Sequence, residues 1–359
     1  MKTPAALLAR LRPLLLLYLL ALGVLAGPAY TLYVHMSLAQ SPDSRDYLNI
    51  ARGEFRGQSI TRRYRVLVPA AAAAVAWPLE KVYARIWPHR AATEWPLRLA
   101  FYLVNTLLMA AVGVVLYATA RRYGAPPAAA ALAVVVVLSS RWAVYLGGLP
   151  LVDSLYLLVF ALAFYAVRAR AGAALAVALV LGPLAKESFV LLVPWLLWWG
   201  RPALPGLRLV GWLALGVGLA LAVRHWIDLR AGAPFAASVS NALSHTENIT
   251  YSLRRLLSVK GAGEIFSIFG FGWLALLAGG RGSAAEGWRP WWVALGAPAR
   301  GFGAVVVVHM LLSGELARMG YLAAPVFTVA LALIISQRGW LREKANADDA
   351  APELGATSA

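Results

Sequence analysis

Long apolar runs flanked by arginine constrain the fold of this chain more than any other feature. Residues 14–34 carry no charged side chain, and the apolar run 97–120 ends at Arg121 and Arg122. About 20 apolar residues are enough to cross the hydrocarbon core of a bilayer as a helix. The chain is 61% hydrophobic and 14% charged, whereas roughly a quarter of a soluble domain is charged. The sequence therefore predicts a polytopic integral membrane protein.

The apolar runs are rich in Ala and Leu and lack the two-residue alternation of a membrane barrel. We expect an all-α protein with about ten transmembrane helices. Lys2, Arg10 and Arg12 precede the first run, and arginines cluster at several predicted turns, which favours cytoplasmic N- and C-termini in the inner membrane. The expected spans are residues 14–34, 97–120, 127–139, 151–167, 173–185, 189–199, 207–223, 265–278, 301–312 and 319–336.

Residues 1–340 are expected to form one membrane domain, followed by a disordered cytoplasmic tail at 341–359. Two long outer loops are expected, at residues 35–96 and 224–264. Within the first, residues 66–82 are short for a span and are interrupted by Pro69 and Pro78. A crossing there would also place Arg121 and Arg122 on the outer side. The segment is therefore predicted to be an interfacial or re-entrant helix.

The net charge of +17 could indicate nucleic acid as a partner. Much of the excess, however, lies beside apolar segments, where it sets topology and meets anionic lipids. No nucleic-acid-binding motif accompanies it, so membrane lipids are the expected partner. The chain has no cysteine, which excludes disulfides, thiolate metal sites and a cysteine nucleophile.

Ionisable side chains gather at the ends of spans on the predicted outer face. Such groups are costly at membrane depth and tend to mark function. Outside the first loop they are Asp153, Lys186, Glu187, Glu315 and Arg318.

Each of these groups also has a purely structural interpretation. Asp153 could cap a helix that follows Pro150. Lys186 and Glu187 could simply be solvated in a tight turn. Glu315 and Arg318, three residues apart, could form a local helical pair.

The first outer loop combines carboxylates with arginines. A short helix is predicted from Asp46 and Tyr47 onward, in DYLNIARGEF, and Asp43 three residues earlier would share a face with Asp46. A carboxylate can accept a proton from an acceptor hydroxyl, while guanidinium groups stabilise a phosphate. The loop thus suits transfer from a lipid-linked phosphate, although its arginines could instead bind anionic head groups. These arginines are Arg62, Arg63 and Arg65.

In PDSRDYLNIARG, RRYRVLVP, VDSLYLLVFALAFY, LAKESFVLLVP and ELARMGYLAAPVF, the chain resembles the GT-C superfamily of membrane glycosyltransferases. The resemblance implies a polyprenyl-phosphate-linked sugar donor and interfacial helices in the first outer loop. It implies that Asp46 is the catalytic aspartate, with Asp43 as the alternative. Arg318 would contact the donor phosphate, and Lys186 is a second candidate for that contact.

The expected function is inverting transfer of a sugar to an acceptor on the outer, periplasmic face. The sequence does not determine which sugar or which acceptor. Asp153, Glu187, Glu315 and Tyr47 are expected to support the site. Mg²⁺ or Mn²⁺ could bind among Asp43, Asp46, Asp153 and Glu187, because oxygen ligands suit these ions. Two other functions are compatible with the pattern: a transporter or flippase for a lipid-linked envelope precursor, and a non-catalytic subunit of an envelope-assembly complex.

Overall fold

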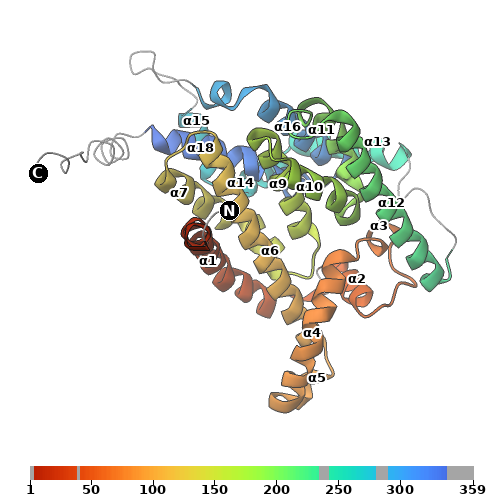
Figure 1. The fold of residues 1–359 in the computed structure, drawn as a ribbon. Helices are drawn as coiled ribbons and strands as arrows, with labels where there is room; N and C mark the ends of the chain where they lie inside the picture. The colour runs from red at the N-terminus through yellow and green to blue at the C-terminus, as the bar shows by residue number, and fades with distance from the viewer. Residues whose placement is uncertain (1–3, 39–40, 234–241, 280–289, 338–359) are drawn as a thin grey trace, which may run out of the picture.

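The computed structural model describes residues 4–38, 41–233, 242–279 and 290–337, and this part of the chain is helical without strands (Figure 1). The expected all-α class is confirmed for these residues, while the expected tail at 341–359 lies outside them. The helices in chain order are α1 (Pro4–His35), α2 (Pro42–Ala51), α3 (Ile60–Arg63), α4 (Leu67–Ile86), α5 (Pro88–Ala91), α6 (Trp95–Arg122), α7 (Pro127–Leu138), α8 (Arg141–Gly148), α9 (Asp153–Ala169), α10 (Gly172–Ala185), η2 (Glu187–Leu192), α11 (Val193–Trp199), α12 (Gly206–Ala231), α13 (Ala242–Leu256), α14 (Val259–Phe269), α15 (Gly272–Ala278), α16 (Trp291–Ser313), α17 (Leu316–Gly320), η4 (Tyr321–Ala323) and α18 (Ala324–Ser336).

Five helical segments of the described chain are long and apolar enough to cross a membrane singly: Arg12–His35, Trp95–Arg122, Gly206–Ala231, Trp291–Ser313 and Leu316–Ser336. The pairs α7–α8 and α14–α15 also qualify, but they bend by 66° and 90°, so the number is seven if each is one broken span. The expected ten crossings are not confirmed. Several expected spans are too short: α10 has 14 residues, about 21 Å at ~1.5 Å per residue.

Helix α6 lies at the centre of the bundle and packs against α1, α4 and α9. Its buried side chains include Phe101, Met109 and Leu116. The last helix, α18, packs against α6 and α7 and brings the C-terminal part of the bundle beside the N-terminal part (Figure 1).

The segment expected to form the first outer loop, called the first loop from here on, contains α2, which starts at Pro42 rather than at Asp46 as expected. Proline is favoured at the first helical position because its φ is already helical and the missing N–H has no partner there. The earlier start puts Asp43 in the first helical turn. Tyr47, Leu48 and Ile50 of α2 are buried and fix the helix against the core.

The expected interfacial segment at residues 66–82 is a continuous helix, α4, of 20 residues. Pro69 lies in its first turn, where no backbone bond is lost, and Pro78 lies inside the helix without ending it. Helix α4 is not among the candidate spans. Together with α5 it projects from one end of the bundle (Figure 1), where Trp77 is 64% exposed.

The expected second outer loop, residues 224–264, is mostly helical instead. Helix α12 continues to Ala231, and α13 and α14 follow after residue 241. The charged residues from Arg224 onward indicate the end of an apolar run, but a helix can continue past the membrane edge with its backbone bonds intact.

Helix α12 is the most peripheral of the candidate spans. Only 11% of its apolar window is buried, against 72% for Leu316–Ser336. It approaches α10 closely at Gly216, where a Cβ would lie 2.4 Å from the carbonyl oxygen of Leu179. The outward apolar face of α12 is the surface expected of a helix in contact with lipid.

Candidate functional site

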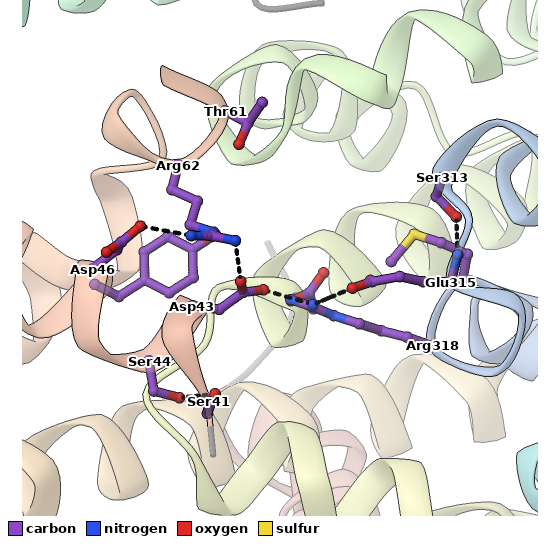
Figure 2. Close-up of polar contacts among 12 residues, drawn as sticks. Ser41, Asp43, Ser44, Asp46, Thr61, Arg62, Ser313, Glu315 and Arg318 are labelled. Atoms are coloured by element: carbon purple, nitrogen blue, oxygen red, sulfur yellow. Dashed lines mark hydrogen bonds and ion pairs between the residues drawn. The ribbon is translucent and has the colours of Figure 1, made fainter. Parts of the chain in front are cut away.

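A chain of ion pairs joins the first loop to the start of the last candidate span (Figure 2). Arg62 binds both loop acids: its Nη1 lies 2.7 Å from Asp46 Oδ2, and its Nη2 lies 2.7 Å from Asp43 Oδ1. Asp43 Oδ2 is in turn 2.8 Å from Arg318 Nη1. Asp43 and Asp46 therefore share one face of α2, as their spacing predicts, and Asp43 lies between two guanidinium groups.

Asp153 extends this chain into the bundle. It stands in the first turn of α9 and is only 3% exposed. Its Oδ1 lies 3.1 Å from Lys186 Nζ, and its Oδ2 binds Arg318. No side chain caps α9, so the interpretation of Asp153 as a helix cap was wrong. Its carboxylate instead neutralises two buried cations.

The position of Asp153 is set by a buried amide on α6. Asn105 Nδ2 donates hydrogen bonds to the carbonyl oxygens of Leu149 and Leu151, at 2.8 and 3.0 Å. The hydroxyl of Ser154 donates to Asn105 Oδ1. The amide thus satisfies backbone groups in the turn before α9 that would otherwise be buried without a partner. It fixes the point at which α9 begins.

Lys186 and Glu187 follow α10 and are not merely solvated, so that interpretation was wrong. Lys186 is 8% exposed, and Glu187 forms a two-point ion pair with Arg65. Burial opposes ionisation of Glu187, but the charge of Arg65 outweighs it and holds the pKa of that carboxyl below its usual value. Arg65 Nη1 also donates to the hydroxyl of Tyr47 at 3.2 Å. Burial raises the pKa of Tyr47 to about 12, so the phenol is neutral near pH 7.

Glu315 and Arg318 do form the local pair that their spacing predicts, at 3.2 Å. Arg318 also binds Asp43 and Asp153, so the pair belongs to the wider network. The side chain of Glu315 is half exposed, whereas that of Arg318 is 9% exposed. The glutamate is therefore a peripheral member of the network.

Arg63 points away from this network. Its Nη2 lies 3.0 Å from Asp228 Oδ1 on α12, and the hydroxyl of Tyr64 donates to the same oxygen at 2.8 Å. Arg63 and Asp228 are both buried. Arg63, expected among the phosphate ligands, instead anchors the loop to the end of α12.

A cavity of about 1000 Å³ opens beside the ion pairs. Most of its charged lining residues come from the first loop, the turn after α10 and the segment around α17. Its apolar lining residues come mainly from α12 and η2, which also contribute Arg224 and Glu187. The charged lining residues are Asp43, Arg62, Arg65, Lys186, Glu187, Arg224, Glu315 and Arg318, and the apolar ones include Val190, Leu191, Leu213, Val217 and Leu221.

Seven of the candidate site residues predicted from the sequence line this cavity, and four do not: Asp46, Tyr47, Arg63 and Asp153. Arg224 lines it but was missed, because residues 224–264 were expected to form a second outer loop and no candidate site residue was assigned there. The signal was present in the sequence as an apolar stripe that ends at the arginine. The stripe residues line the cavity and recur at helical spacing: Leu213, Val217, Ala220, Leu221 and Arg224.

The carboxylates considered as metal ligands are each bound by a cation. Arg62 holds Asp43 and Asp46, Lys186 holds Asp153, and Arg65 holds Glu187. Among the described residues, no three His, Cys, Asp or Glu side chains lie together as a metal-binding group. These residues, as arranged, do not fit Mg²⁺ or Mn²⁺.

No protein-family model, curated protein or solved structure matches the chain. The candidate site is therefore argued from its geometry. The carboxylate of Asp43 can accept a proton, and the cations and apolar residues of the cavity lining can hold an anion attached to an apolar chain.

Proposed function

We propose that this chain is a glycosyltransferase of the GT-C type, which moves a sugar from a polyprenyl-phosphate donor to an acceptor hydroxyl. The observation that supports this proposal is a cavity lined by both charged and apolar residues. Its lining holds five cations against three acids, which suits a phosphate, and the apolar residues of α12 suit the attached lipid chain. Arg318 and Ser313 of the lining lie at the ends of candidate spans, where a lipid-linked donor presents its head group.

Asp43 is the better candidate for the general base, because it lines the cavity whereas Asp46 does not. Its two oxygens bind Arg62 and Arg318. A carboxylate has about four lone-pair sites, so an acceptor hydroxyl can still donate to Asp43. Asp46 then positions Arg62 rather than the substrate.

In the proposed step, the acceptor oxygen attacks the anomeric carbon on the side opposite the phosphate. The new glycosidic C–O bond forms as the bond from that carbon to the phosphate oxygen breaks. The hydroxyl proton passes to Asp43, and the electron pair of the broken bond leaves on the lipid phosphate. A single displacement inverts the anomeric configuration. A cation that lines the cavity stabilises the charge that grows on the leaving phosphate.

The proposal places the cavity on the outer face of the inner membrane and both termini in the cytoplasm. That arrangement needs an even number of crossings. Seven candidate spans become eight if α9 also crosses, and its 17 residues are at the lower limit for a transmembrane helix. Addition of a membrane-impermeant thiol reagent to single-cysteine variants at exposed positions, in a chain without native cysteine, would test this orientation.

Release of polyprenyl phosphate from a polyprenyl-phosphate sugar, in membranes that contain the chain, tests the catalytic proposal. We expect Asp43→Asn to lower the rate on the order of 100-fold or more, the usual contribution of a general base. Asp46→Asn should have a smaller effect. Glu54→Gln, an exposed acid of the same loop, is the matched control and should retain the full rate.

Undiminished release by a normally inserted Asp43→Asn variant would refute the assignment. The same assay separates transfer from transport. A flippase moves the intact donor across the bilayer and releases no polyprenyl phosphate.

A further inference from the structure

We infer that Arg224 is the cation that takes the phosphate of a lipid-linked ligand, and that Arg63 and Tyr64 keep it available by holding Asp228. The inference rests on the proposed function only for the identity of the ligand. The evidence for it is a difference in pairing among the cations that line the cavity.

The other four cavity cations are already neutralised by carboxylates. Arg62 binds two aspartates, Arg65 binds Glu187, Lys186 binds Asp153, and Arg318 binds three acids. An anion that approached any of them would have to compete with a carboxylate a few ångströms away. Ion pairs with this degree of burial are costly to break.

Arg224 differs from these four cations. Across the described residues, no carboxylate lies within ion-pair distance of its guanidinium. It is half-buried and lines the cavity, and its guanidinium carbon lies 5.2 Å from the centre of the Tyr64 ring. The ring orients the guanidinium by a cation–π contact but does not neutralise its charge. Arg224 therefore offers the cavity a positive charge that a phosphate can satisfy with two parallel hydrogen bonds.

The absence of a carboxylate partner has a specific cause in the sequence. Asp228 stands four residues after Arg224 on α12, which is the spacing at which helical side chains meet. Asp228 is instead bound by Arg63 and Tyr64 from the first loop. The pairing of Asp228 across elements thus removes the nearest acid from Arg224.

The place of Arg224 on α12 indicates the kind of anion. The apolar stripe from Leu213 leads to Arg224 along one face of the helix, a length of about 16 Å at ~1.5 Å per residue. An alkyl chain on this stripe would end with its head group at the guanidinium. The same anion chemistry occurs in free phosphate, which lacks the chain. The stripe favours a phosphate that carries an apolar chain.

The test is isothermal titration of the full chain in phosphatidylcholine nanodiscs, with octyl phosphate and inorganic phosphate as separate probes. We expect octyl phosphate to bind more tightly than inorganic phosphate. Arg224→Gln should weaken octyl phosphate binding roughly tenfold to hundredfold, the range for a hydrogen bond to a charged group. Arg230→Gln is the matched control, because Arg230 lies on the same helix over the Trp226 ring but does not line the cavity.

Wild-type affinity in Arg224→Gln would overturn the inference, and so would an equal loss in Arg230→Gln. Equal affinity for the two probes would overturn the assignment to a lipid-linked phosphate. The titration measures binding and not sugar transfer, so the two proposals can fail separately. Arg224-dependent binding by a chain that releases no polyprenyl phosphate would refute the proposed function and leave this inference standing.

Two further variants test the hold on Asp228. Arg63→Gln with Tyr64→Phe removes both first-loop contacts of Asp228 and should weaken octyl phosphate binding, because Asp228 can then turn toward Arg224. Adding Asp228→Asn to this variant should restore binding. Unchanged affinity in Arg63→Gln with Tyr64→Phe would overturn this part. Should that variant fail to fold, Asp228→Asn alone decides. It leaves Arg224 without an acidic neighbour, so affinity at or above wild type supports the inference and a tenfold loss overturns it.

Discussion

The two buried cations held by Asp153 make this residue the most sensitive position in the ion-pair network. Replacing Asp153 with Asn keeps the size and polarity of the side chain but removes its charge. Lys186 would then lose the only carboxylate that binds it among the described residues, while Arg318 would keep Asp43 and Glu315. Both cations have side chains only 9% exposed, so water would compensate poorly for the lost charge.

Removing one partner of a buried ion pair costs about 3–5 kcal/mol, because the remaining charge stays buried without compensation. At about 2 °C per kcal/mol for a large chain, we expect Asp153→Asn to lower the apparent melting temperature by about 6–10 °C. Glu315→Gln removes a charge from the same Arg318, but Glu315 is half exposed. A solvent-exposed ion pair of this kind contributes about 0–1 kcal/mol to the free energy of unfolding, so Glu315→Gln should lower the melting temperature much less than Asp153→Asn does.

The assay is thermal unfolding in one detergent at a fixed heating rate, followed by intrinsic tryptophan fluorescence. The double variant Asp153→Asn with Lys186→Met removes both the carboxylate and its cation, and it should recover much of the lost stability. The reasoning fails if Asp153→Asn is no less stable than Glu315→Gln. It also fails if the double variant is less stable than Asp153→Asn alone.

Two further predictions concern the ion pair of Glu187 and the packing of α12. The pKa of Glu187 is lowered in the folded chain from an ordinary value of 4.5, so its stabilising contribution is complete above that pH and is lost as the pH falls through the lowered value. The difference in melting temperature between wild type and Glu187→Gln should therefore shrink between about pH 5 and strongly acidic pH, and a difference that grew on acidification would contradict the ion pair. On α12, Gly216→Ala should destabilise the chain by about 1–3 kcal/mol, the usual cost of overpacking, because its Cβ would meet backbone atoms of α10. A Cβ at Gly218 would meet open space, so Gly218→Ala should be neutral or slightly stabilising through helix propensity. Equal effects of the two substitutions in thermal unfolding would argue against close packing of α12 on α10.

Local patterns in the sequence were sufficient for the class of the protein and for most helices. Runs of apolar residues determine a helical membrane protein because the backbone must satisfy its own hydrogen bonds in lipid. The three-residue spacing of Asp43 and Asp46 was likewise enough to place both on one face of α2. Local patterns were not sufficient for the number of spans, because short apolar helices such as α10 can be buried within the protein without crossing the bilayer.

The partners of the charged residues were decided only by the tertiary structure. Asp43 and Arg318 meet across 275 residues of sequence, and no local pattern encodes that contact. The adjacent arginines Arg62 and Arg63 were equivalent in the sequence, yet the end of α3 directs one to the cavity network and the other to Asp228. The partner of Asp228 shows the same dependence, because Arg63 lies 165 positions earlier in the chain, and the charge inferred to be available on Arg224 follows from that contact. Helical periodicity is a property of neighbouring residues, whereas charge pairing depends on which helix ends the packed core brings together.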